Sequence, residues 1–188
     1  MSLLRSSHIR HGIKVTSMGL ILACSSQAHA SAEFEASGKA TAELRLFPEN
    51  PQYIDQYQDA NLSLALEPDF FWQWNDTLDS LTFKPFFRLD QHDNERTHAD
   101  IRELSWVHQG DGWELRSGIR KVFWGVTEFQ HLVDVINQSD GIEDIDGEDK
   151  LGQPMINLSL VKSWGIVDLY LLLGFREQAF PGKEGSLR

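Results

Sequence analysis

The chain has 188 residues, with 28 acidic and 17 basic side chains. Its net charge of −11 argues against nucleic acid as a partner, because phosphate binding requires clustered lysine and arginine. The mean hydropathy is −0.34, and the absence of a long apolar run excludes a transmembrane helix. These numbers do not exclude a transmembrane β-barrel, because polar residues that face the lumen dilute the apolar ones along each strand.

The first 30 residues have the pattern of a secretory signal peptide. The positive n-region contains Arg5, Arg10 and Lys14. Residues 15–23 form a short apolar segment, and an A-x-A cleavage site ends at Ala30. We expect cleavage after Ala30, which leaves residues 31–188 as the mature domain. A lipoprotein signal that uses Cys24 is the alternative, and Leu22 fits it poorly.

Removal of this segment makes the chain more acidic and removes its cysteine. The 14 remaining basic residues against 28 acidic ones leave a net charge of −14, and Cys24, the only cysteine, is lost. A cysteine-free exported protein is not a disulfide-stapled secreted module. The acidic, aromatic-rich and exported chain is typical of the Gram-negative envelope, and we expect it in the outer membrane.

Seven runs of alternating polar and apolar residues predict β-strands, because successive strand side chains point to opposite faces. The predicted strands are 34–47, 58–74, 81–90, 99–108, 113–123, 155–161 and 166–175. The first alternates strictly and is longer than the roughly 5–6 residues of a usual strand. Pro68 lies inside the second and predicts a bulge or a local break. The fourth is the least regular.

Short turns alternate with longer connections along this series, as in a barrel with periplasmic turns and extracellular loops. The predicted turns are 75–79, 109–112 and 162–165. Five tryptophans lie near these turns, where a periplasmic aromatic girdle belongs: Trp72, Trp74, Trp106, Trp113 and Trp164. The pattern predicts an all-β antiparallel meander that forms part of a transmembrane β-barrel. A soluble β-sandwich is the alternative for alternating strands.

Seven strands are too few for a bacterial barrel, which uses an even number from about eight upward. An open sheet in lipid would leave the backbone groups of its edges unpaired at high cost. We therefore expect the chain to be the N-terminal portion of a longer barrel. Its expected partners are outer-membrane lipid, the barrel-assembly machinery and a small solute.

The block GIRKVFWGVTEFQHLVDVINQSDGIEDIDGEDKLGQP resembles a block in uncharacterised Gram-negative outer-membrane proteins related to porin and alginate-export-type barrels. The flanking WELRSG and the later LLLGFREQAFPG are similar to that group as well. The resemblance covers roughly residues 100–188. It implies an outer-membrane barrel that acts as a channel or porin, and it brings no catalytic or binding residues.

Charged side chains on the polar faces of the strands are candidate pore-lining residues, because charges in a lumen tune ion selectivity. The candidates are Lys84, Arg88, Glu103, Glu114, Arg116 and Arg120. We hypothesise that Arg88, Arg116 and Arg120 form a basic patch that attracts anionic solutes or pairs with the acidic run 140–149. The alternative is a lumen whose opposite charges simply pair across neighbouring strands.

The long connection after the fifth strand carries two further signals. Apolar residues from Phe129 to Ile136 recur at helical spacing, so a short helix that folds into the lumen or covers the rim is one hypothesis, and an ordinary surface loop is the other. An acidic cluster follows: Asp140, Glu143, Asp144, Asp146, Glu148 and Asp149. Oxygen-rich loops of this kind bind calcium in some proteins, but the spacing of these acidic residues does not match an EF-hand. A solvated or arginine-paired cluster is the favoured interpretation.

The sequence gives little support for catalysis, and we expect neither a cofactor nor a metal. The histidines are scattered, and the motifs of hydrolases and nucleotide-binding proteins are missing. The leading hypothesis is a porin-like channel for small solutes, for which an anionic solute is one option. A soluble periplasmic β-rich binding protein is the alternative, and a membrane-embedded barrel enzyme is the third hypothesis.

Overall fold

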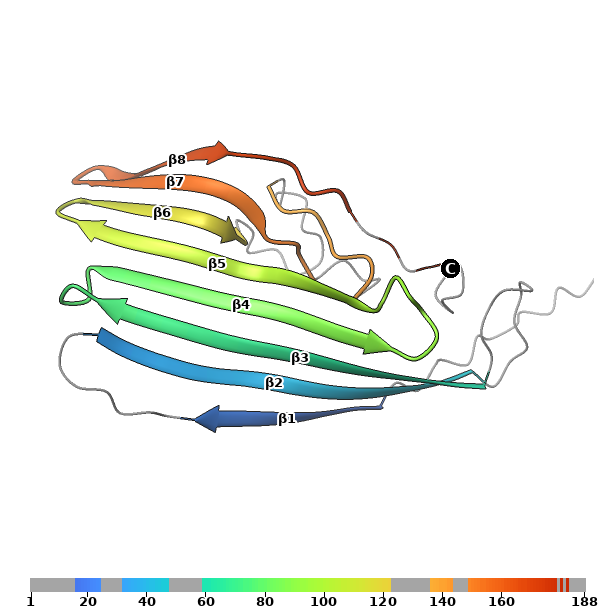
Figure 1. Ribbon diagram of the computed structural model, residues 1–188. Helices are drawn as coiled ribbons and strands as arrows, with labels where there is room; N and C mark the ends of the chain where they lie inside the picture. The colour runs from blue at the N-terminus through green and yellow to red at the C-terminus, as the bar shows by residue number, and fades with distance from the viewer. Residues whose placement is uncertain are drawn as a thin grey trace, which may run out of the picture.

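The computed structural model describes residues 16–24 (backbone only), 32–47, 59–122, 136–143, 149–178, 180 and 182. Within these ranges the chain forms one antiparallel sheet whose strands follow one another in sequence order (Figure 1). The strands are β1 Thr16–Cys24, β2 Ala32–Phe47, β3 Asp59–Trp74, β4 Asp79–Asp90, β5 His98–Gly110, β6 Trp113–Arg120, β7 Gln153–Lys162 and β8 Gly165–Leu172. Because β1 and β8 lie at opposite edges, the described sheet is not closed.

The seven strands predicted from the sequence are confirmed as β2 to β8, with small changes at their ends. β6 ends at Arg120 and β8 at Leu172, three residues earlier than the alternation predicts in each case. β1 was not predicted. It lies within the expected signal peptide and pairs with β2 from Thr16↔Leu44 to Cys24↔Ala36. Cleavage after Ala30 would remove β1 and leave β2 at the edge of the sheet.

The connections have different lengths at the two ends of the sheet (Figure 1). We call the end with the connections 75–78, 111–112 and 163–164 the turn end, and the opposite end the loop end. The β3–β4 turn is tight: the Leu78 amide donates to the Asn75 carbonyl at 3.0 Å, and Asn75 has φ 57°. Asparagine and aspartate tolerate this left-handed conformation better than most residues.

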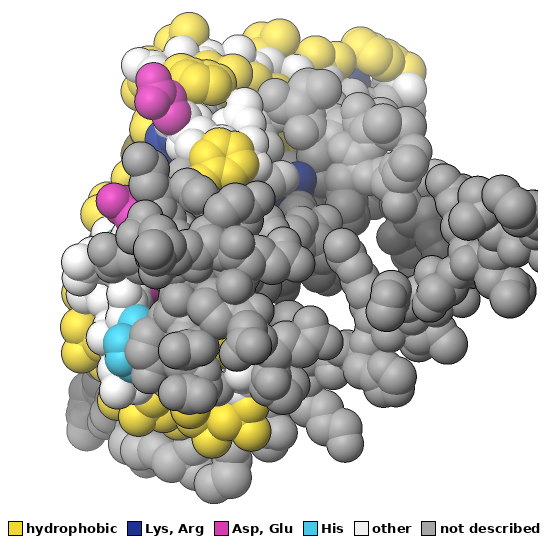
Figure 2. All heavy atoms as spheres, turned by 90° about the vertical axis from the view of Figure 1, so that its right-hand side faces the viewer, with side chains coloured by type: hydrophobic (Ala, Val, Ile, Leu, Met, Phe, Trp, Pro, Cys, Tyr) yellow, Lys and Arg dark blue, Asp and Glu magenta, His cyan; other side chains and the backbone are white. Residues whose placement is uncertain are grey.

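The two faces of the sheet are inverted relative to a soluble sheet. Ser63 is 3% exposed, whereas the next residue, Leu64, is 51% exposed; Glu43 and Leu44 repeat the contrast on β2. We call the buried polar face the inner face and the exposed apolar face the outer face. Viewed from the loop end, hydrophobic side chains of the described residues lie along the outer rim of the curved sheet (Figure 2). Few apolar side chains are buried: Ala65, Phe86, Ile142, Leu151 and Met155.

An aromatic ladder crosses the outer face near the turn end. Phe34 contacts Trp72 across the β2–β3 pair, with ring centroids 5.1 Å apart. Phe70 contacts Phe83 across the β3–β4 pair at 6.2 Å. Such cross-strand aromatic pairs stabilise a sheet and fix its register.

The local break expected at Pro68 is present on one side of β3. Pro68 pairs with Gly38 of β2 without a register shift, but the pairing of β3 with β4 is interrupted at residues 67–69. On the other side of β4, the pairing with β5 slips between Lys84 and Pro85. A Cβ at Gly38 would approach the Glu67 carbonyl to 3.0 Å, so glycine allows the close strand contact here. The slip explains the poor alternation of β5, and it brings the Arg102 guanidinium to 4.2 Å from the centre of the Phe86 ring.

Candidate functional site: the inner polar face

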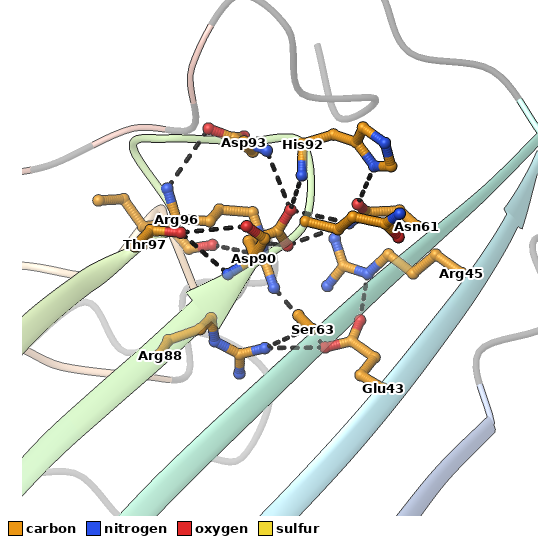
Figure 3. Close-up of polar contacts among 12 residues, drawn as sticks. Glu43, Arg45, Asn61, Ser63, Arg88, Asp90, His92, Asp93, Arg96 and Thr97 are labelled. Atoms are coloured by element: carbon orange, nitrogen blue, oxygen red, sulfur yellow. Dashed lines mark hydrogen bonds and ion pairs between the residues drawn. The ribbon is translucent and has the colours of Figure 1, made fainter.

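A carboxylate on β2 is the centre of a charged cluster at the loop end of the inner face (Figure 3). Glu43 forms ion pairs with Arg45 on its own strand, with Arg88 of β4 at 3.1 Å and with Arg96 of the β4–β5 connection at 3.6 Å. The Arg88 guanidinium also donates to the Ser63 hydroxyl at 2.9 Å. Charge-assisted bonds of this kind are stronger than neutral ones, so the cluster joins the three neighbouring strands β2, β3 and β4 to the connection that follows β4.

A second carboxylate, Asp90, ends β4 and organises the connection that follows it (Figure 3). Its oxygens accept hydrogen bonds from the Asn61 amide at 3.0 Å and from the backbone amides of His92 and Asp93 at 3.1 and 3.0 Å. The Arg96 Nε donates to it at 3.1 Å. Aspartate commonly caps a turn in this way, and here it also directs Arg96 into the cluster.

The long connection between β6 and β7 folds onto this cluster. Arg88 forms an ion pair with Glu143 at 2.6 Å, and Arg96 donates to the Ile142 carbonyl at 2.6 Å. Arg102 forms an ion pair with Asp140, which is only 1% exposed. Arg88 of β4, Arg102 of β5 and Arg96 of the connection between these strands therefore hold residues 140–143 against the inner face.

Residues 136–143 and 149–152 form a small hairpin of their own, which we call the inner hairpin. The Asp140 amide donates to the Asp149 carbonyl and the Leu151 amide to the Gln138 carbonyl, both at 2.8 Å. Asp140 also accepts a bond from the Ile142 amide at 3.1 Å, which closes the turn. The predicted helix ending at Ile136 lies almost wholly outside the described residues.

Asn137 fixes the base of the inner hairpin. Its side-chain oxygen accepts from the Val122 amide at 2.8 Å, and its nitrogen donates to the carbonyls of Arg120 and Leu151, both at 2.9 Å. Asn137 is 5% exposed, so these bonds are formed in a buried environment. It joins the end of β6 to the approach of β7.

The segment after β8 closes the same end from the other side. Arg176 donates to Asp100 of β5 at 2.7 Å and to the Gly152 carbonyl at 3.0 Å. The Gly182 amide donates to the Asp93 carboxylate at 3.3 Å. Arg176 lies just beyond both the predicted strand 166–175 and the end of β8 at Leu172.

The middle of the inner face is less tightly paired. Lys84 of β4 is 2.9 Å from Asp69 and 3.9 Å from Glu103. Arg116 of β6 forms an ion pair with Glu114. Within the part of the chain that the structure describes, the Nε and Nη1 atoms of Arg120 are buried and have no hydrogen-bond partner.

The structure separates the residues of the predicted basic patch. Arg88 forms ion pairs with Glu43 and Glu143. These contacts agree with the interpretation in which charges of the polar face pair with each other and with the acidic run. Arg116 and Arg120 lie apart from that cluster on β6. In the acidic run, Asp140 and Glu143 are paired and Asp149 is exposed, while Asp144, Asp146 and Glu148 lie outside the described residues.

The predicted girdle tryptophans lie at the turn end, on β3, β5, β6 and the β7–β8 turn: Trp72, Trp74, Trp106, Trp113 and Trp164. Trp164 is 76% exposed. The His108 ring contacts Trp106 and Trp113 at 6.1 and 5.4 Å, and its Nδ1 is 2.8 Å from the Asp79 carboxylate. Two groups of contacting rings therefore lie at the turn end of the outer face, one on β2 to β4 and one on β5 and β6.

Sequence reasoning missed Arg96, Arg102 and Asn137. The first two lie in a connection and at a register slip, where alternation assigns no face, and Asn137 lies in the long connection. Arg102 also affects the neighbouring Lys121, whose pKa is lowered first by burial and then by this positive charge. An irregular fourth strand rich in charge was the one available signal.

The contacts described on the inner face are ion pairs and hydrogen bonds. Among the described residues, no group of three histidine, cysteine or acidic side chains is arranged to hold a metal ion. No helix in the described ranges is long and apolar enough to cross a membrane.

Comparisons with known proteins leave these observations to stand alone. The chain matches no family model, no curated protein and no solved structure. The likeness to porin-related and alginate-export-type barrels noted from the sequence therefore stays a prediction.

Proposed function

We propose that this sheet is part of an outer-membrane β-barrel and that the protein is a porin-like channel for small solutes. The inverted faces carry the proposal: polar side chains such as Ser63 are buried on the inner face, while Leu64 and its neighbours are exposed on the outer face. Contact of apolar side chains with lipid is favourable, whereas exposure of the same side chains to water is unfavourable.

The ends of the sheet support the same proposal. Short turns gather at the aromatic end, and the charged connections gather at the other, which is the polarity of a barrel whose turns face the periplasm. The open edges would then pair with further strands, because unpaired backbone groups are costly in lipid. The inner hairpin would narrow the pore at the loop end.

Fractionation and conductance test the proposal together. The protein, expressed with its N-terminal segment in a Gram-negative host, should be found in the outer-membrane fraction and require detergent for extraction. Purified and added to planar lipid bilayers, it should produce stepwise ion conductance. A protein recovered from the periplasm without detergent would contradict the proposal and favour the soluble binding protein.

A further inference from the structure

The middle of the inner face contains a cation with unused hydrogen-bonding capacity. The Nε and Nη1 atoms of Arg120 are buried without a partner among the described residues. A buried charged donor without an acceptor is costly, and such groups in native proteins usually have an acceptor, an ordered water or a bound ion. Arg120 is therefore a position at which a ligand acceptor would be stabilised.

The carboxylates near Arg120 are engaged elsewhere. Two of the described carboxylates, Glu103 and Glu114, lie within electrostatic range of Arg120. Glu103 is 3.9 Å from Lys84, and Glu114 forms an ion pair with Arg116. These neighbours lower the local positive charge without supplying an acceptor to the two free nitrogens of Arg120.

The strands around Arg120 place a second arginine beside it. Alternation puts Arg116 and Arg120 on the same face of β6, on either side of Gly118. The register aligns Arg116 with Asn157 of β7, and Asn157 with Tyr170 of β8. Tyr170 lies within electrostatic range of both arginines, so an oxyanion here would lie near side chains of β6 and β8.

We propose that Arg120, with Arg116 and Tyr170, forms a binding site for a small oxyanion, a carboxylate or a phosphate, within the pore. This inference rests on the proposed channel function and names its selectivity site. Arg88 does not contribute, because two carboxylates, Glu43 and Glu143, hold its guanidinium, whereas Arg116 pairs with one, Glu114. A guanidinium recognises carboxylate and phosphate groups equally through its planar donors.

The test uses the complete protein in planar bilayers, with wild type, Arg120→Gln and the control Lys162→Gln. Lys162 is an exposed cation at the turn end, so both variants lose one positive charge. Reversal potentials in a potassium chloride gradient give the anion preference, and inorganic phosphate and succinate are added separately as blocking anions. Correct folding of each variant is checked by heat-modifiable migration on gels.

We expect Arg120→Gln to reduce the anion preference and to weaken block by at least one of the two anions by about tenfold or more, as for loss of a charged hydrogen bond. Lys162→Gln should retain wild-type block. The anion that loses block identifies the ligand class. Conducting Arg120→Gln protein with wild-type selectivity and block would overturn the site while leaving the channel function intact.

A wild-type protein without conductance would instead overturn the channel function. The site is then measured by calorimetric titration of the detergent-solubilised protein with phosphate and with succinate. Binding that is lost in Arg120→Gln and kept in Lys162→Gln would support the site independently of transport, and wild-type protein that binds neither anion would refute it.

Discussion

Gly118 lies in β6 at a point where the neighbouring strand comes very close. Its φ of 135° is rarely adopted by residues with side chains, and an added Cβ would lie 1.8 Å from the Leu104 carbonyl oxygen. That contact involves backbone on both sides, so it cannot be relieved by a change of rotamer. The residue is required by the β5–β6 pairing itself.

We therefore expect Gly118→Ala to destabilise the fold by about 1–3 kcal/mol or more, through backbone strain and loss of strand pairing. Urea unfolding in lipid vesicles, followed by tryptophan fluorescence, measures the change. Gly174→Ala is the matched control, because a Cβ at Gly174 would meet nothing within 4 Å. Equal stability of the two variants would contradict this account of Gly118.

Arg88 provides a second prediction at the scale of the residue. Its side chain is 9% exposed and contacts two carboxylates, so Arg88→Met leaves Glu43 and Glu143 each short of a cation. Removal of one member of a buried ion pair typically costs about 3–5 kcal/mol, and we expect a loss toward the lower end because Arg45 and Arg96 remain. The free energy of unfolding in urea is the measurement.

Lys39→Met serves as the control for Arg88→Met. The Lys39–Glu67 pair is 3.7 Å apart, with side chains 56% and 41% exposed. Exposed pairs contribute about 0–1 kcal/mol, so this variant should unfold close to wild type. If both variants lose the same stability, the inner cluster has no special role in holding the fold.

At the scale of the element, the inner hairpin depends on one side chain at its base. Asn137→Ala removes three hydrogen bonds, each with a net contribution of about 0.5–1.5 kcal/mol. We expect the amide of Val122 to exchange its hydrogen at least about tenfold faster, since that amide loses its acceptor. Mass spectrometry of the exchanged protein reports this change.

Gln138→Ala, at the next position, leaves the three bonds of Asn137 in place and should exchange as wild type does. A result in which both variants exchange alike would mean that the backbone pairs of the inner hairpin, rather than Asn137, hold it to the sheet. The amide of Leu151, which donates to the Gln138 carbonyl, is the second reporter for this comparison.

The strands were predictable from sequence because alternation is a local signal. The alternation over Phe34–Phe47 predicts both faces of a strand without information from the rest of the chain, and β2 has nearly these bounds. The slip at Lys84 and Pro85 was visible only as poor alternation in β5, since a change of register depends on the partner strand. Pro68 correctly indicated the break in the β3–β4 pairing, whereas the slip between β4 and β5 left only this indirect sign.

The contacts of the inner face were harder to predict for a physical reason. Glu43 meets Arg88, 45 positions away, because β2, β3 and β4 lie side by side, and the register alone aligns them. The partners Asp140 and Glu143 belong to a long connection whose path no period describes. The predicted candidate Arg88 was therefore correctly placed on the polar face, while its function as a clamp became apparent only from the fold.

The apolar outer face makes the cost of an introduced charge depend on its depth in a bilayer. Leu66 lies near the middle of β3 and is 51% exposed on the outer face. In a membrane, Leu66→Arg should cost about 2–4 kcal/mol, whereas Leu46→Arg, near a strand end, should cost about 0–1 kcal/mol. Unfolding from lipid vesicles measures the two values.

The soluble alternative makes the opposite prediction for this pair. In water, an exposed leucine gains nothing from its surroundings, so either arginine should be tolerated and should improve solubility. Equal stability of Leu66→Arg and Leu46→Arg, with less aggregation than wild type, would count against a lipid-facing surface.

The contacts of the inner hairpin predict that the fold does not require an unbroken chain between Glu143 and Asp149. Residues 137–143 are anchored by Asn137 and by three arginines of β4, β5 and the connection between them, and residues 149–152 lead directly into β7. Both sides of a cut between Glu143 and Asp149 would thus remain bound without the peptide bond. The two halves of the protein, produced as separate polypeptides divided there, should reassemble into one complex. Additional sequence could then be inserted between Glu143 and Asp149 without interrupting a strand of the sheet.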